Sequence, residues 1–159
     1  MHRPRPTEVQ AWIADYDPLA ITALVDPLVE RYGFDARSPY AETYWLGVVG
    51  PSAMWALRRL TAWLAAEPAG FELPLGPLGR ELGLGVGVGR HAPLVRSLAR
   101  LVVFDLARIT DVALAVRCTV PPLAQRHLTR LPAHLVDLHP AAHVNGARGS
   151  ELATVEPHA

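Results

Sequence analysis

Apolar residues change their spacing in a defined order between residues 71 and 120. A short extended run comes first, followed by helical spacing, a glycine-rich stretch, a second stretch of helical spacing and two alternating runs. The segments are 71–75, 77–84, 83–90, 89–102, 104–109 and 112–120. This order predicts a strand, a helix, a turn, a second helix and a two-stranded hairpin. We therefore expect an α+β fold, mainly α-helical with a small β-hairpin.

The second helix of this series, expected over 91–103, has two different sides. Leucine and valine at helical spacing form a buried stripe, while Arg96, Ser97 and Arg100 fall opposite. A helix of this kind can dock on a scaffold and place guanidinium groups against phosphates or guanine edges in a DNA groove. Arg90 and His91 lie at its start, where the helix dipole also favours phosphate. The alternative for the two helix arginines is a solvated surface.

The hairpin is expected to have a two-residue tip at Thr110 and Asp111. Strict alternation in its second run predicts two sets of side chains. The inward set is Val112, Leu114, Val116, Cys118 and Val120, and the outward set is Ala113, Ala115, Arg117 and Thr119. Arg108 and Arg117 are then the charged contacts of the hairpin. The candidate DNA-binding residues are Arg90, His91, Arg96, Ser97, Arg100, Arg108 and Arg117.

The flanking segments predict an N-terminal helical segment, a central domain and a tail. Residues 1–49 are interpreted as several short helices, because Asp17, Asp26 and Ser38 each precede a proline suited to a first helical turn. Most aromatic residues lie in this segment, either as a small core or as a partner-binding surface. Residues 50–138 begin with a helix over 51–66 and end with a closing helix over 123–138, interrupted at Pro132. Residues 139–159 are expected to be a flexible tail.

The formal net charge is zero, but the charges are unevenly distributed. All 15 basic residues are arginines; ten of them, against five acidic residues, lie between residues 50 and 130. The basic character therefore coincides with the strand–helix–helix–hairpin pattern. Cys118 is the single cysteine, which excludes an intramolecular disulfide and a cysteine zinc finger. With no secretory signal at the N-terminus and a longest uncharged run of 15 residues, we expect a soluble cytoplasmic protein without a membrane span.

Other chemistry is disfavoured by context. The four glycines of GLGVGVGR resemble a phosphate-binding loop, but a helix instead of a strand precedes them and no GK[ST] follows. His134, His139 and His143 make a poor metal platform beside Pro140. No Ser–His–Asp or Cys–His arrangement is marked by a motif. We expect no cofactor, no metal and no enzymatic activity.

The run from Phe71 to Val120 resembles the winged helix-turn-helix domains of bacterial transcription regulators. The wider arrangement SPYAETYWLGVVGPSAMWALRRL followed by GRHAPLVRSLARLVVFDLARI is similar to small proteins of high-GC, actinobacterial-type bacteria. The resemblance implies a helix over 92–102 in the major groove of double-stranded DNA and a hairpin tip beside the backbone or minor groove. It also implies a transcriptional regulator that acts as a homodimer.

The competing hypothesis is a protein–protein interaction or assembly module without DNA binding. Its partner would bind the winged domain and the aromatic N-terminal helices, and the neutral net charge supports it. Salt separates the two hypotheses, because contacts to phosphate weaken steeply with ionic strength and an apolar protein interface does not.

Overall fold

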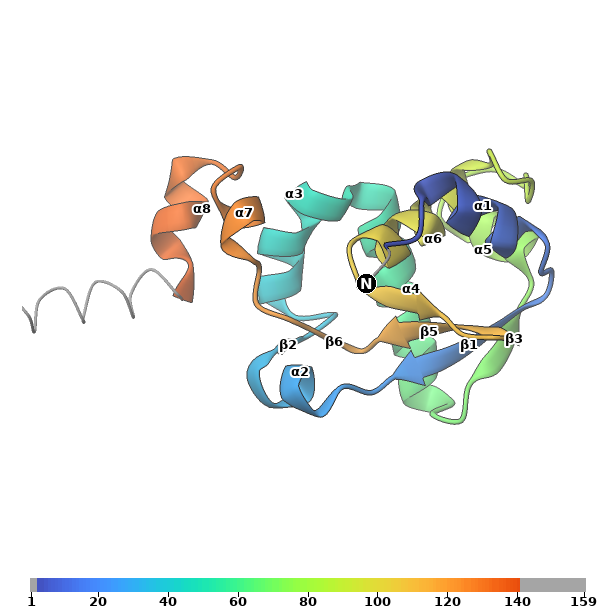
Figure 1. Cartoon of the computed structure of the whole chain (residues 1–159), viewed down its shortest axis with the longest axis horizontal. Helices are drawn as coiled ribbons and strands as arrows, with labels where there is room; N and C mark the ends of the chain where they lie inside the picture. Colours follow the sequence, from blue (N-terminus) through green and yellow to red (C-terminus); the bar gives the residue numbers. More distant parts are fainter. Residues whose placement is uncertain (1–2, 141–159) are drawn as a thin grey trace, which may run out of the picture. The chain divides into compact units, whose positions relative to one another are not determined.

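The computed structural model of the chain describes residues 3–140 and shows a mixed α and β fold (Figure 1). These residues belong to two compact units, which divide between Pro122 and Leu123. The division does not coincide with the expected boundaries near residues 49 and 138. The N-terminal segment is instead part of the same unit as the strand–helix–helix–hairpin series.

A four-stranded sheet forms the base of the first unit, in the order β3-β1-β5-β4. The strands are β1 (Leu19–Leu24), β3 (Phe71–Leu73), β4 (Ala107–Ile109) and β5 (Ala113–Arg117). β1 pairs in parallel with β5, with Ile21 opposite Leu114, and antiparallel with β3, with Ile21 opposite Phe71. The interpretation of residues 19–24 as helical is therefore wrong. This segment supplies a central strand of the sheet.

The helices of the first unit are α1 (Pro6–Ala14), α2 (Pro27–Tyr32), the π-helical turn η1 (Ala41–Trp45), α3 (Leu46–Val49), α4 (Pro51–Ala66), α5 (Leu75–Glu81) and α6 (Pro93–Val103). Both α1 and α4 pack against α6, and Figure 1 shows α1 alongside it. α6 buries six of its residues: Leu94, Val95, Ser97, Leu98, Ala99 and Leu101. Its apolar stripe is as expected from the sequence, but the covering by α1 was not foreseen.

A two-stranded sheet pairs β2 (Phe34–Asp35) with β6 (Thr119–Val120). The aromatic residues nearby are mostly packed: Phe34 and Tyr40 stack with their ring centroids 3.7 Å apart. Trp45 is buried and donates its Nε1–H to the carbonyl oxygen of Pro121 at 3.0 Å. Of these three residues, Trp45 lies in the core, while Phe34 and Tyr40 are half-buried. Tyr32, by contrast, is 58% exposed.

Several local predictions are confirmed. α4 covers the expected residues 51–66, and Asp26 caps α2 by accepting hydrogen bonds from the amides of Leu28 and Val29. In the second unit, the segment expected as a closing helix forms two short helices, α7 (Gln125–Leu128) and α8 (Ala133–Leu138). The break between them includes Pro132, where an interruption was expected. Of the expected tail, residues 141–159 lie outside the described residues. Between residues 3 and 140, no helix combines the length and apolar character that crossing a bilayer requires.

Candidate nucleic-acid interface

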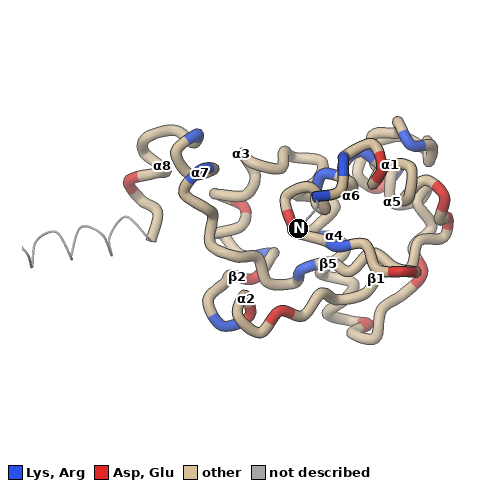
Figure 2. Tube along the Cα trace, in the orientation of Figure 1, with Lys and Arg blue, Asp and Glu red and all other residues tan. Residues whose placement is uncertain are grey.

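α6 presents a narrow polar stripe to solvent. Pro93, Arg96 and Arg100 are its exposed residues. Because positions four apart lie one above the other on a helix, the two arginines share one side, one turn apart. Arginine positions gather around this helix (Figure 2). The stripe is one residue wide, since α1 and α4 cover the helix on either side of it.

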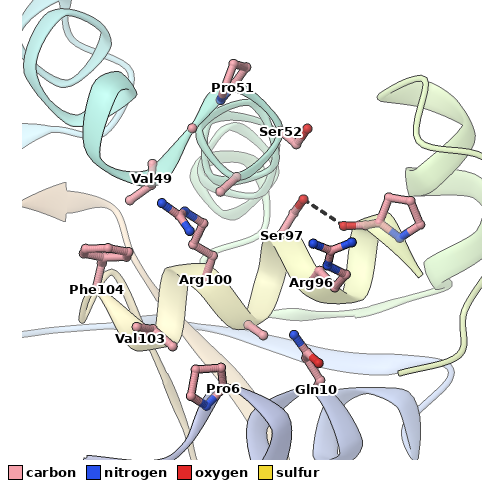
Figure 3. Close-up of a pocket in the computed structure, with 14 residues that line it drawn as sticks. Pro6, Gln10, Val49, Pro51, Ser52, Arg96, Ser97, Arg100, Val103 and Phe104 are labelled. Atoms are coloured by element: carbon pink, nitrogen blue, oxygen red, sulfur yellow. Dashed lines mark hydrogen bonds between the residues drawn. The ribbon is translucent and has the colours of Figure 1, made fainter. Parts of the chain in front are cut away.

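The stripe lies in a groove of about 420 Å³ whose walls come from three distant segments (Figure 3). α1 contributes Pro6 and Gln10, and the opposite wall is residues 49–53, where α3 ends and α4 begins. α6 supplies Arg96 and Arg100 between them. The groove is therefore a depression with a basic centre. We call it the α6 groove.

Arg100 is held in place by its own fold. Its Nη2 donates to the carbonyl oxygen of Val48 at 3.0 Å, and its guanidinium carbon lies 5.1 Å from the centre of the Phe104 ring. The bond to Val48 satisfies one of the carbonyls at the end of α3. A guanidinium has five N–H donors, so this arrangement orients Arg100 and leaves donors for an anion.

The side chain of Arg96 is exposed and has no hydrogen bond or ion pair with any residue between 3 and 140. In Figure 3 the Arg96 side chain projects from α6 between α1 on one side and the start of α4 on the other. An unpaired guanidinium beside a second arginine favours a bidentate contact with phosphate or carboxylate.

Ser97 does not belong to this exposed stripe. It is 8% exposed, and its hydroxyl donates to the carbonyl oxygen of Pro93 at 2.8 Å, as Figure 3 shows. The prediction that Ser97 faces away from the buried side is therefore wrong. Figure 3 shows Ser97 on the side of α6 that faces the start of α4, and α4 packs against α6.

The first turn of α4 adds a second source of positive potential to the groove. Gly50 is the N-cap residue of α4, with φ of +85°. No side chain among residues 3–140 accepts a capping hydrogen bond there. Ser52 and Ala53, whose amides lie in the first turn of a 16-residue helix, line the groove. Amides of a first helical turn lack intrahelical acceptors and favour anions.

Arg90 and His91 lie on the turn before α6 and are both exposed. The Nε–H of Arg90 donates to His91 Nε2 at 3.3 Å. Neither residue lines the α6 groove. They could only extend a contact surface beyond it.

The two hairpin arginines form ion pairs with acidic residues. Arg108 is exposed but its Nε contacts Asp105 Oδ1 at 3.0 Å. Arg117 is 2% exposed and contacts both Asp105 and Asp26, so the prediction that it faces outward is wrong. All five residues of β5 are buried, so both faces of this strand are covered. Val112, expected inside, is 69% exposed.

Cys118 and the histidines are the remaining candidates for reactive or metal-binding groups. Burial raises the pKa of the half-buried Cys118 thiol, and the nearby acidic residue Glu30 raises it further, which disfavours the reactive thiolate. Within residues 3–140 no cluster of His, Cys, Asp and Glu suits a metal ion, and His143 lies outside that range. His139 is buried, and desolvation lowers its pKa.

Comparison of the chain with protein-family models, curated proteins and solved structures finds no match.

Proposed function

We propose that this chain is a DNA-binding protein of winged helix-turn-helix type, in which α4, β3, α5, α6 and the β4–β5 hairpin form the winged unit. The observation that carries the proposal is the unpaired guanidinium of Arg96, exposed on α6 and placed in a groove with Arg100. Exposed, unpartnered arginines beside helix-terminal amides are the groups that bind phosphate.

The proposed contact is mainly with the DNA backbone. Reading bases needs several side chains that reach base edges, and α6 exposes only Pro93, Arg96 and Arg100 along its length. The hairpin contributes little charge, because Arg117 is buried and Arg108 pairs with Asp105. We therefore expect modest sequence preference and strong dependence on salt. The further role as a transcriptional regulator is supported by the sequence resemblance.

Fluorescence anisotropy with a labelled DNA duplex at low salt tests this proposal. Arg96→Ala should weaken binding by about tenfold, the loss expected for a direct phosphate contact. Arg31→Ala is the matched control, because Arg31 is also exposed but lies on α2 and does not line the α6 groove. Equal affinities for the wild type and Arg96→Ala, or no duplex binding at low salt, would overturn the proposal.

A second candidate function, protein interaction through the N-terminal segment, is favoured by the surface of α2. Leu28 and Tyr32 are 68% and 58% exposed and lie one helical turn apart, and Val25 just before the helix is 71% exposed. Such an apolar surface suits a second copy of the chain or another protein. Sedimentation equilibrium tests the homodimer: Leu28→Asp should shift the protein toward monomer, and a wild type that is monomeric at all concentrations contradicts it.

A further inference from the structure

A second depression adjoins the α6 groove at the first turn of α4. It has a volume of about 310 Å³ and is lined by Pro51, Ser52, Trp55, Arg59, Glu81 and Leu82. Pro51 and Ser52 also line the α6 groove, so the two depressions share one border. A ligand held by Arg96 in the first can therefore continue across Ser52 into the second.

Trp55 is the dominant apolar surface of this second depression. Its side chain is 56% exposed, although neighbouring positions on the same helix, such as Met54 and Ala56, are buried. Arg58 lies over the indole, 5.6 Å from the ring centre, and is itself tied to Glu42 at 3.2 Å. Trp55 lines the depression and Arg58 does not. The indole surface inside the depression is therefore available to a ligand. A large aromatic surface held open in this way suits stacking.

The opposite side of the depression carries hydrogen-bonding groups of both kinds. Arg59 from α4 and Glu81 from α5 form an ion pair, with Nη1 and Oε2 2.9 Å apart. The pair leaves further guanidinium donors and carboxylate acceptor sites. Nucleobase edges carry both acceptors and amino donors, and these groups can pair with both.

We propose that this second depression binds an unpaired nucleobase stacked on Trp55, while the adjoining phosphate is bound by Arg96 and the first turn of α4. A positively charged track beside an aromatic platform is the arrangement by which proteins bind single-stranded nucleic acid. Bases inside a duplex are already stacked on their neighbours and cannot stack on an indole without being extruded. The inference rests on the proposed function, because it extends the same phosphate site.

Binding of three labelled probes by the full chain tests the inference. The probes are an oligothymidine of about 12 nucleotides, a blunt duplex and the same duplex with a single-stranded overhang. The proteins are the wild type, Trp55→Ala, Trp55→Phe, Arg96→Ala and the control Arg31→Ala, each checked for native circular dichroism. Trp55 is exposed, so its replacement leaves the core unchanged.

Trp55→Ala should weaken binding of the oligothymidine and the overhang duplex by about tenfold and leave the blunt duplex within about twofold, as loss of one stacked base requires. Trp55→Phe should retain most of the affinity, and Arg96→Ala should weaken all three probes. Unchanged binding of the single-stranded probes by Trp55→Ala, or an equal loss for the blunt duplex, overturns the inference. If the Trp55 variants overturn the inference but Arg96→Ala still weakens duplex binding, the proposed function stands. If the wild type binds none of the probes, both the inference and the proposed function are rejected.

Discussion

Arg117 lies beside Asp105 at the base of the β4–β5 hairpin, with Nη2 3.0 Å from Oδ2 and Nε donating to the Asp105 carbonyl oxygen at 2.6 Å. Its Nη1 also contacts Asp26 Oδ2 at 3.4 Å. Asp26 is the residue that caps α2. One buried guanidinium therefore joins the start of α2, the turn after α6 and the strand β5.

Replacing Arg117 with alanine should destabilise the protein substantially. The side chain is 3% exposed, and the change removes its bonds to Asp105 and Asp26 and leaves a cavity. We expect a loss of about 2–3 kcal/mol in the free energy of unfolding, because breaking a buried ion pair costs more than breaking an exposed one. Arg108→Ala is the control: it removes an exposed pair with the same Asp105 and should cost about 0.5 kcal/mol. Urea denaturation measures both, and equal losses would contradict this account.

The same cluster should make stability depend on acidic pH. Desolvation alone would raise the pKa of Asp105, but hydrogen bonds from Arg108 and Arg117 outweigh it and hold that pKa below 3.8. At Asp26 desolvation is likewise outweighed, by hydrogen bonds from the Val29 amide and Arg117, so its pKa is also lowered. The unfolded chain binds protons more readily than the folded one at these two carboxylates. Their stabilising contribution is therefore present above 3.8 and is lost as the pH falls through the lowered values.

Thermal unfolding between pH 7 and pH 3 checks this linkage. The wild type should lose stability as the pH drops toward and below 3.8. Arg117→Met should lose less over the same interval, because removal of the guanidinium returns the pKa of both carboxylates toward the unfolded value. A variant with the same or a steeper loss would show that Arg117 does not lower these pKa values.

β1 should be essential to the stability of the first unit. Ile21 is completely buried between its sheet neighbours on β3 and β5. Ile21→Ala should lower the free energy of unfolding by about 2–4 kcal/mol through lost burial and a cavity. Val25→Ala, just after the strand at 71% exposure, should change it by less than about 0.5 kcal/mol. Similar small effects in denaturation experiments would indicate that residues 1–49 fold apart from the sheet.

Gly79 should be required for the packing of α5 against the glycine-rich turn. A Cβ at this position would collide with the carbonyl oxygen of Gly85, a backbone atom that cannot rotate away. Alanine is favoured over glycine inside a helix by roughly 1 kcal/mol, but the steric collision should outweigh this gain. Gly79→Ala should therefore lower the free energy of unfolding by about 1–3 kcal/mol. Gly89→Ala, with open space at its Cβ, should be neutral or slightly stabilising. Equal stability of the two variants in urea would refute this close approach.

Local sequence signals predicted the elements whose structure depends on nearby residues. α4 begins at a proline and runs over the expected residues, and α6 buries the expected apolar stripe. β1 was missed because Asp17 and Pro18 were interpreted as a helix start. In the structure the Asp17 carboxylate instead accepts a hydrogen bond from the amide of Leu75, 58 positions away. The sequence LAITAL did carry a strand signal in its β-branched residues between two Asp–Pro pairs.

The site was predictable only in part for a similar reason. Arg96 and Arg100 are exposed on one side of α6, as expected. The groove around them is assembled from α1, the start of α4 and α6, and no local pattern reveals that these segments meet. The outward position of Arg117 followed from alternation, which predicts one covered face of a strand. β5 is buried at every position, so both of its faces are covered and the alternation does not separate inward from outward residues.

The most direct test of phosphate binding at the α6 groove is the salt dependence of duplex affinity, measured between about 50 and 200 mM salt, where backbone contacts weaken steeply. A plot of the logarithm of the binding constant against that of the salt concentration gives the number of phosphate contacts as its slope. For Arg96→Ala the slope should be smaller by about one unit than for the wild type, with Arg31→Ala unchanged. An identical slope for the wild type and Arg96→Ala, or affinity independent of salt, would contradict phosphate binding by this arginine.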